Sequence, residues 1–556
     1  MNPASLIHPL SLNVFAYLGC VAGVLGILVT CGVVTVWRGF AFRDAFFAAL
    51  IACAAAVVLE PSLNHAAGLR TSPDSVEYAV GALNIFSHGR YEIAIGGEAF
   101  APRYPIGFSL FVVLPSLILA GPGSLGVGVY SVVLLGALGV AAAFLVGRRL
   151  YNRAAGLMAA AIVLVIPGYA GASQEVLTFV PAAGLSLLVF AFLLAGSKSG
   201  LVRWIAVGLT SMIAVACRPT SAVMLLPIIV AWWRDTEATR LREVLLGVFP
   251  TLIWIGASFF YNEEVFGNPF RTGYHLWCPI PYDYPQLLLN GGYLGDNFSA
   301  FFSSGSLILF AVAVVGLLQL KERESVTPVQ LSTALAVLIA ALIIVQFHLF
   351  YFYQWELYFL VSSALMAPLA ACALNSLVRK ALPRGRLLVA ICLLAASGTT
   401  TWFRVRSEAA RDTQQFEQLM TLKQTASLSG DEGGVVVITG RNPVLVESEA
   451  GILTIPVSRR VEYASKLLAP RKLDIGDPTA ISPTDHRNAR LRSAGAMEAL
   501  TGTALTDPQL ILRLLSRGVV VLIDTPSLSS DEREALDARF RIEPVGSGVE
   551  RIATQR

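Results

Sequence analysis

Charged residues are scarce in this chain of 556 residues: they make up 14% of it, against 55% for hydrophobic residues. Ordinary soluble domains contain about 25% charged residues, so this composition excludes that class of protein. The mean hydropathy of +0.65 points the same way. The sequence therefore predicts a polytopic protein of the lipid bilayer, and we expect no nucleic acid among its partners.

Cysteine is also rare, and the 7 cysteines follow no spacing typical of a metal site or a disulfide framework. Most of them lie inside apolar runs, where reduced thiols pack well. The N-terminus lacks a basic stretch followed by a small-residue cleavage site. We therefore expect residues 12–37 to be a true membrane span rather than a removed signal peptide.

Apolar segments suited to membrane helices recur as far as residue 402. The expected spans are 12–37, 45–59, 124–147, 154–168, 176–195, 204–217, 221–233, 244–261, 301–320, 331–345, 357–377 and 387–402. Several are shorter than the ~20 residues that a full span needs. One further apolar run, 106–120, suits either a short span or a helix that stays on one side of the membrane.

The distribution of Lys and Arg decides between these two alternatives, because cytoplasmic loops carry an excess of both. If residues 106–120 do not cross, sixteen of the basic residues before position 404 fall on one side and five on the other. This asymmetry predicts about twelve spans and a re-entrant or surface helix at 106–120. It places the first outer loop (61–105), an aromatic outer loop (261–300) and the C-terminal tail outside the cytoplasm.

From residue 404 to 556 the composition is that of a soluble domain. Residues 434–440, 451–457 and 518–524 read as short buried strands. The stretches TDPQLILRLLSRG and SSDEREALDARF carry helix start and stop signals. We expect a small extracytoplasmic α/β domain here. It has no Gly-rich phosphate loop and no metal-ligand spacing, so a structural or recognition role is expected.

The stretch SPDSVEYAVGALNIFSHG predicts a helix that starts after Ser72 and ends before Gly89. At 100° per residue, Asp74, Glu77 and Tyr78 share one face, and apolar residues cover the other. We expect a surface-lying helix whose two carboxylates face water. The acids either take part in chemistry or only stabilise the positive end of the helix dipole.

A second acid, Glu175, follows a predicted span on the same side of the membrane. An acid this close to an apolar helix is costly unless it is solvated, paired or functional. Arg103 and Arg218 lie on that side too, and the planar guanidinium suits a phosphate. Interfacial placement alone would also account for each of these residues.

The aromatic outer loop contains Tyr274 and His275, which together with Tyr78 and Tyr104 are candidates for binding a sugar. A membrane-interface belt, which enriches Trp and Tyr, is an equally good account of the aromatic residues. Glu356, in HLFYFYQWELYF, is expected either to enter the site or to pair with an arginine.

The order of these motifs resembles the GT-C superfamily of integral membrane glycosyltransferases. The groups most similar are the aminoarabinose transferases, the protein mannosyltransferases and the rhizobial lipopolysaccharide transferases. The resemblance covers roughly residues 69–377. It rests on SPDSVEYA, RYPIGFSLFVVLP, GRRLYNR and SQEV in that order, supported by YNEEVFGNPFRTGYH and YFLVSSALMAPLAA.

The resemblance implies a mainly α GT-C domain over residues 1–403. It implies sugar transfer from a polyprenyl-phosphate donor, usually with inversion, to a glycan, lipid or protein outside the bacterial cytoplasmic (inner) membrane. Asp74 matches the expected general base and Glu175 the second-loop acid. Arg103 matches a basic residue that contacts the donor phosphate. The family often has aspartate where Glu175 stands and a second proline after Pro105, and the first span here is an addition.

Some GT-C relatives hold a divalent metal between such acids. Asp74, Glu77 and Glu175 could supply oxygen ligands, but three oxygens are not a specific pattern, and we expect no required metal or other cofactor. The chemistry itself needs a base near the acceptor hydroxyl and cations near the departing phosphate.

Two other functions fit a chain of this kind. A transporter or flippase for lipid-linked or small anionic solutes would place ionisable groups near the membrane midplane and often shows internal repeats. Here the acids lie at one outer interface, no repeat is evident and a soluble domain is appended, which favours an enzyme. In a non-catalytic scaffold, Asp74 and Glu175 would be dispensable.

Overall fold

The computed structural model describes most of the chain, and the statements below concern those residues. They are 14–60, 73–95, 98–121, 125–195, 200–234, 241–277, 282, 288–352, 355–382, 384–429, 435–439, 453–456, 515, 520–524, 528, 530–538, 540–546 and 549–553.

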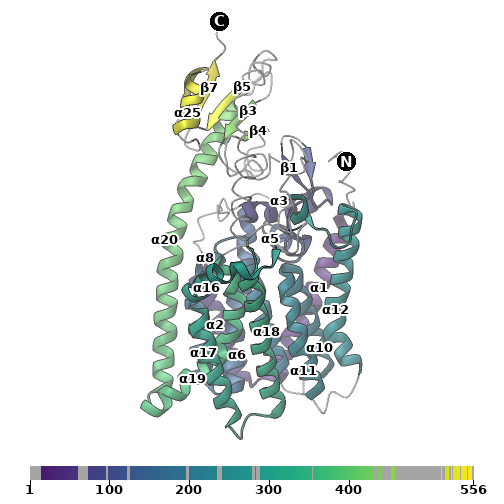
Figure 1. Cartoon of the computed structure of the whole chain (residues 1–556), viewed down its shortest axis with the longest axis vertical. Helices are drawn as coiled ribbons and strands as arrows, with labels where there is room; N and C mark the ends of the chain where they lie inside the picture. Colours follow the sequence, from purple (N-terminus) through teal and green to yellow (C-terminus); the bar gives the residue numbers. More distant parts are fainter. Residues whose placement is uncertain are drawn as a thin grey trace.

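Long helices stand side by side and form a bundle (Figure 1). Their bounds are α1 Val14–Gly39, α2 Phe42–Leu59, α6 Gly128–Leu150, α7 Arg153–Val165, α9 Phe179–Leu194, α10 Gly200–Cys217, α11 Leu225–Arg234, α12 Leu241–Phe266, α17 Ser306–Lys321, α18 Pro328–Phe350, α19 Leu360–Ala381 and α20 Arg386–Ser429. In the described part of the chain, 8 helices are long and apolar enough to cross a membrane, or up to 9 if the bent pair that ends in α17 is one span. The protein is therefore a multi-pass membrane protein.

The remaining expected spans correspond to α7, α9 and the helical stretch Pro219–Arg234, which are apolar but shorter. Almost every residue of α9 is buried, and so are most residues of α7. Neighbouring helices cover most of the surface of these two helices. They therefore contact protein more than lipid, and they can be shorter than the hydrocarbon layer is thick. The expectation of about twelve spans depends on counting these three segments.

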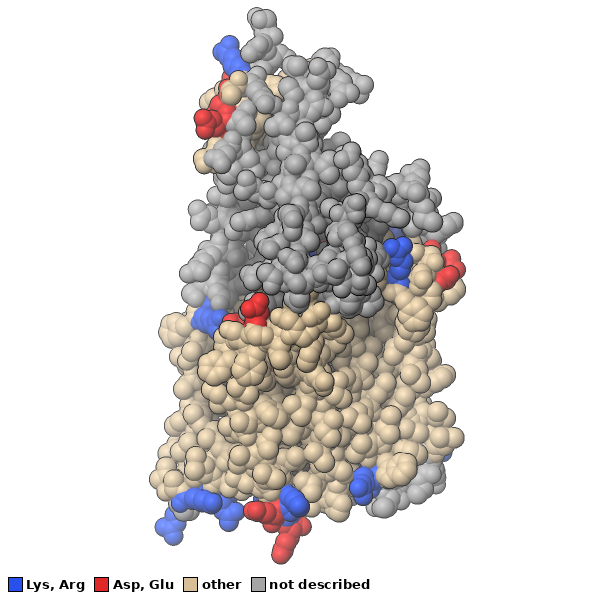
Figure 2. Space-filling model, viewed as in Figure 1, with Lys and Arg blue, Asp and Glu red and all other residues tan. Residues whose placement is uncertain are grey.

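The outer surface of the bundle suits lipid. Figure 2 shows a broad belt without charged side chains, bordered by charged side chains of both signs at its lower and upper ends. The helices α1, α12 and α20 expose large apolar side chains, among them Val33, Leu252, Phe260 and Leu388. Apolar surface of this extent is found in soluble proteins only at interfaces, whereas in a bilayer it is the expected lipid-facing surface.

The apolar run 106–120 forms α4 (Ile106–Phe108), a π-helical segment (Ser109–Val113) and α5 (Leu114–Ala120). It packs against α3 (Pro73–His88), and Gly107 contacts the backbone of Ala216 at the end of α10. Figure 1 shows α3 and α5 together at one end of the bundle. The run therefore stays at that end, as expected for a helix that does not cross.

Several short elements gather at the same end of the bundle. A two-stranded antiparallel hairpin, β1 (Ile93–Ile95) and β2 (Glu98–Phe100), connects α3 to the segment that precedes α4. The short helices are α8 Tyr169–Ser173, α13 Gly273–Trp277, α16 Leu294–Ser303, and the 3₁₀ turns Pro219–Met224 and Glu356–Phe359. Irregular backbone is tolerated here because protein or water satisfies its polar groups.

The C-terminal region contains a five-stranded sheet in the order β4-β3-β5-β7-β6. Its elements are β3 Val435–Thr439, β4 Leu453–Pro456, β5 Val520–Asp524, α25 Ser530–Asp537, β6 Arg541–Gly546 and β7 Val549–Ala553. The three predicted strands and the predicted helix SSDEREALDARF are confirmed, and β6 and β7 were not predicted. The helix expected in TDPQLILRLLSRG lies outside the described residues, except for Leu515. The composition change at residue 404 falls inside α20, so a continuous helix connects the bundle to the sheet.

Candidate active site

The two acids of the first outer loop lie in the first turns of α3. Pro73 opens this helix, and Gly89, with φ of 69°, follows its last residue, so the predicted bounds are confirmed. The prediction that this face of the helix meets water is wrong for Glu77 and Tyr78, which are 0% and 5% exposed. Periodicity identified the polar face correctly, but the segment after the hairpin and the start of α4 cover it. The Asp74 side chain remains 29% exposed.

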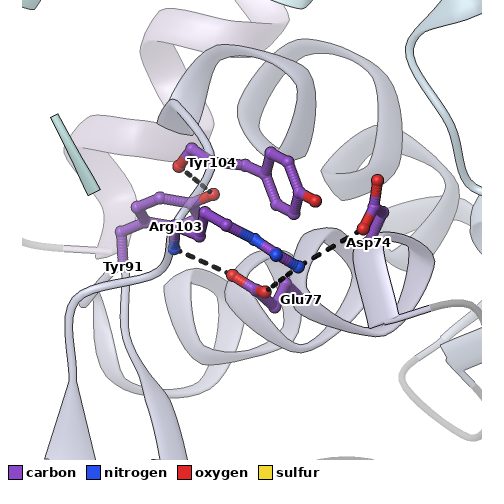
Figure 3. A network of polar contacts seen from close by, with 5 residues as sticks. All are labelled: Asp74, Glu77, Tyr91, Arg103 and Tyr104. Atoms are coloured by element: carbon purple, nitrogen blue, oxygen red, sulfur yellow. Dashed lines mark hydrogen bonds and ion pairs between the residues drawn. The ribbon is translucent and has the colours of Figure 1, made fainter. Parts of the chain in front are cut away.

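Arg103 brings the two carboxylates together (Figure 3). Its Nη2 lies 3.0 Å from Glu77 Oε1 and 3.3 Å from Asp74 Oδ1, and its backbone N–H donates to Glu77 Oε2 at 2.8 Å. The guanidinium also lies over the Tyr104 ring, 4.6 Å from its centroid. Tyr91 Oη donates to the Tyr104 carbonyl oxygen at 3.0 Å. A buried carboxylate needs such compensation, so Arg103 balances Glu77 and holds one oxygen of Asp74.

Arg218 provides a second cation directly after α10. Its guanidinium lies 4.3 Å from the ring centroid of Phe179 and 5.2 Å from that of Tyr358. Burial lowers the pKa of Arg218, although a guanidinium stays protonated in proteins. Within the described residues, its buried Nε has no hydrogen-bond partner and no carboxylate pairs with it. A buried cation with spare hydrogen-bond donors is suited to an anionic ligand.

Five tyrosines, which we call the tyrosine row, connect the surroundings of the two arginines. Tyr104 meets Tyr274 edge to face at 5.4 Å, and Tyr274 stacks on Tyr282 at 4.9 Å. Tyr282 and Tyr351 share a hydrogen bond of 2.5 Å, and Tyr351 contacts Tyr358 at 5.6 Å. The row therefore leads from Arg103 and Asp74 to Arg218.

Burial raises the pKa of Tyr78, Tyr104 and Tyr274 well above the ordinary tyrosine value. These phenols remain neutral hydroxyl groups at any physiological pH, and so they can donate hydrogen bonds to an oxygen-rich ligand. Tyr78 also contacts Tyr104 and Phe108, both at 4.7 Å between ring centroids.

The other predicted site residues lie around this centre. Glu175 is partly buried and stands shortly before Phe179, whose ring contacts Arg218. His275 Nδ1 accepts a hydrogen bond from the Thr272 backbone N–H at 3.1 Å, and its ring lies 5.5 Å from that of Tyr282.

Glu356 stays a predicted site residue. It is exposed and accepts a hydrogen bond of 2.7 Å from Ser303 Oγ of α16, and among the described residues no arginine pairs with it. The 3₁₀ turn that begins at Glu356 points this carboxylate outward and directs Tyr358, two residues later, toward Arg218.

Sequence reasoning missed the aromatic surroundings of Arg218. Phe179 comes from α9, whereas Tyr351 and Tyr358 come from the stretch 348–359, and so no single motif connects all three. The density of aromatic residues in HLFYFYQWELYF was the available signal for two of them.

The acids do not fit a metal site. Among the described residues, no three or more His, Cys, Asp or Glu side chains form a group that could hold a metal ion. The Arg103 guanidinium lies between Asp74 and Glu77, at the place where a cation shared by these acids would bind.

No protein-family model matches the chain, and no curated protein matches it significantly by sequence. Solved structures do match. ArnT from Cupriavidus metallidurans bound to undecaprenyl phosphate has a TM-score of 0.57 at 13% identity, covering 91% of this chain and 97% of ArnT. The apo state of the same protein has a TM-score of 0.56 at 14% identity, with 92% and 98% covered. The similarity to the oligosaccharyltransferase AglB from Archaeoglobus fulgidus is weaker, with a TM-score of 0.46 at 12% identity, covering 96% and 74%. The similarity to the two ArnT structures shows that the chain has the fold of the GT-C membrane glycosyltransferases.

Proposed function

We propose that the protein transfers a sugar from a polyprenyl-phosphate donor to an acceptor outside the cytoplasm, with inversion at the sugar carbon. The observation that carries this proposal is the placement of a carboxylate and a cation at opposite ends of the tyrosine row. A partly exposed carboxylate, Asp74, lies beside one end of the tyrosine row. Arg218, a cation that pairs with no carboxylate among the described residues, lies beside the other end. A base for the acceptor and a cation for the leaving group are what such a transfer requires.

In the proposed reaction, the acceptor hydroxyl oxygen attacks the sugar carbon, and Asp74 takes the hydroxyl proton. The bond from the sugar carbon to the phosphate oxygen breaks, and its electron pair leaves with the polyprenyl phosphate. Arg218 stabilises the charge on the departing phosphate. Attack and departure on opposite faces of the sugar invert its configuration.

The other candidate residues have supporting roles in this proposal. Arg103 stays a predicted contact of the donor phosphate, but two carboxylates already share its charge, and so Arg218 carries the larger part. Tyr78, Tyr104, Tyr274 and His275 bind the sugar through ring faces and neutral donors. Glu175, shortly before Phe179, is the predicted second acid.

The location and partners are proposed on similar grounds. ArnT, with the same fold, was solved with undecaprenyl phosphate, a lipid that suits a bundle open to the bilayer. The excess of Lys and Arg in the loops opposite to α3 supports an active site and a C-terminal domain on the extracytoplasmic side of the bacterial inner membrane. The acceptor is a cell-envelope glycan, lipid or protein.

Asp74→Asn tests the proposal directly. Membranes that contain the variant are supplied with a radiolabelled polyprenyl-phosphate sugar, and transfer to the envelope fraction is measured. We expect a loss of about 10²- to 10⁴-fold, the usual contribution of a general base. Glu264→Gln, which removes an exposed carboxylate from α12, is the matched control and should retain activity. Full activity of well-expressed Asp74→Asn would exclude Asp74 as the base.

Mass spectrometry of glycolipids and cell wall from a deletion strain separates the enzyme from a flippase. Loss of a transferase leaves an acceptor without its sugar, whereas loss of a flippase leaves an intact lipid-linked precursor in the inner leaflet.

A further inference from the structure

Glu77 is in an unusual position for a residue of a reaction centre. Its side chain is 0% exposed, and both of its oxygens accept hydrogen bonds from Arg103. One oxygen bonds the backbone N–H and the other bonds the guanidinium, so Glu77 fixes Arg103 at both ends of its side chain. Because it is enclosed by protein, Glu77 cannot touch an acceptor.

Arg103 uses the same terminal nitrogen, Nη2, for both acids: the contact to Glu77 is 3.0 Å and the contact to Asp74 is 3.3 Å. A change that releases the guanidinium from Glu77 would therefore change its contact with Asp74. The Arg103 side chain is 10% exposed, and so little water is present to screen these charges.

We infer that Glu77 is a positioning residue that acts through Arg103, setting both the orientation of Asp74 and the charge around it. This inference rests on the proposed function of Asp74. It differs from a shared catalytic role of the two acids, because only Asp74 meets the substrate.

The groups that face Asp74 determine the sign of the expected effect. Glu77 and Tyr78 lie on the same helix as Asp74. Arg103 and Tyr104 come from the segment after the hairpin, and Tyr274 comes from α13. Arg218 lies farther away and interacts with Tyr78. The tyrosines are neutral, so among the described residues Glu77 and Arg103 are the charges that balance each other next to Asp74. Without Glu77, the full charge of Arg103 favours the ionised form of Asp74 and makes it a weaker base.

Glu77→Gln is therefore expected to lower kcat by about 10- to 100-fold, because the base is misplaced and weakened, with a smaller change in the donor KM. The acid limb of kcat/KM should move to lower pH, because the Arg103 charge is then no longer shared with Glu77. Arg103→Gln should move the same limb to higher pH. The double variant should lose little more activity than Arg103→Gln alone, because Glu77 acts through Arg103.

A second readout does not depend on transfer. Carbodiimide modifies protonated carboxyl groups, and peptide mass spectrometry of the detergent-solubilised full chain gives the extent of Asp74 labelling at each pH. The labelling midpoint should fall in Glu77→Gln and rise in Arg103→Gln, while Glu264→Gln should leave it unchanged. The labelling experiment can be read even if the wild-type chain is inactive with every polyprenyl-phosphate sugar. Such inactivity would refute the proposed function but not the effect of Glu77 on Asp74.

An unchanged labelling midpoint in folded Glu77→Gln overturns the inference, as does a loss of activity that adds fully to that of Arg103→Gln. If Glu77→Gln is lost from membranes, Glu77→Asp keeps the charge and shortens the side chain by one methylene. It should then lower kcat and leave the acid limb and the labelling midpoint in place. Wild-type kcat in Glu77→Asp would likewise overturn the inference.

Discussion

Replacing Arg218 by methionine should weaken donor binding without weakening the fold. Methionine keeps much of the apolar length of the side chain and removes the charge. The guanidinium makes two cation–π contacts, to Phe179 at 4.3 Å and Tyr358 at 5.2 Å, and has an unpartnered buried Nε within the described structure. The described part of the free protein thus holds a partly desolvated cation that no carboxylate neutralises.

The two opposing terms can be compared. Each cation–π contact contributes about 0.5–2 kcal/mol, and desolvation of one ion costs several kcal/mol. Arg218→Met removes the cation–π contacts together with the desolvation cost, so we expect the free energy of unfolding to rise by roughly 0–2 kcal/mol. In the complex, a phosphate about 4 Å from the guanidinium gains at most about 4 kcal/mol at an effective dielectric constant of 20. The expected loss of about 2–4 kcal/mol corresponds to a donor KM raised about 30- to 1,000-fold.

Two measurements check this prediction: the donor KM in reconstituted vesicles, and Tm in detergent without donor. A donor KM within threefold of the wild-type value would show that Arg218 does not bind the phosphate. A fall in stability of more than about 3 kcal/mol would show instead that the aromatic rings depend on Arg218 as a structural partner.

Two further substitutions test the surroundings of the site. In Gly273→Ala, the new Cβ would clash with the carbonyl oxygens of Pro102 and Arg103 and push α13 off this segment. We expect transfer to fall at least about tenfold, with Tm little changed. Gly295→Ala, where a Cβ meets open space, is the control, and equal activity of the two variants would show that the contact of α13 with this segment does not matter for transfer. Asp44, 5% exposed, bonds Arg148 at 2.9 Å and Arg153 at 2.8 Å at the opposite end of the bundle. Asp44→Asn should lower the free energy of unfolding by about 1–3 kcal/mol; the loss is moderate because both arginines are partly solvated. The change is measured by thermal unfolding in detergent, and kcat should stay unchanged. A stability equal to that of the exposed control Glu324→Gln would show that the cluster contributes nothing.

Local signals in the sequence predicted the elements of the site well. Pro73 and Gly89 mark the ends of α3, and the charge asymmetry placed the run 106–120 at one end of the bundle. These features depend on a few neighbouring residues or on the sign of loop charges, which a single sequence contains. Three of the five strands of the C-terminal sheet, β3, β4 and β5, were predicted from the same kind of local signal.

The contacts within the site depend on folding over long distances, and there the predictions were less accurate. Helical periodicity put Glu77 on a polar face, but it carries no information about the hairpin that returns Arg103 over that face. Arg103 meets Glu77 across 26 positions of sequence, and Phe179 meets Arg218 through the packing of α9 beside α10. Span lengths were similarly ambiguous, because a short helix such as α9 is acceptable only when other helices surround it.

The continuity of α20 has a geometric consequence for the sheet beyond the bundle. The apolar part of this helix ends at Arg406, and helical backbone continues to Ser429. At 1.5 Å per residue, the extension is about 35 Å long, so the helix acts as a spacer that sets both the height and the rotational phase of the sheet (Figure 1). One inserted residue would turn the sheet by about 100° around the helix axis, whereas seven would raise it by about 10 Å and return it to nearly the same direction.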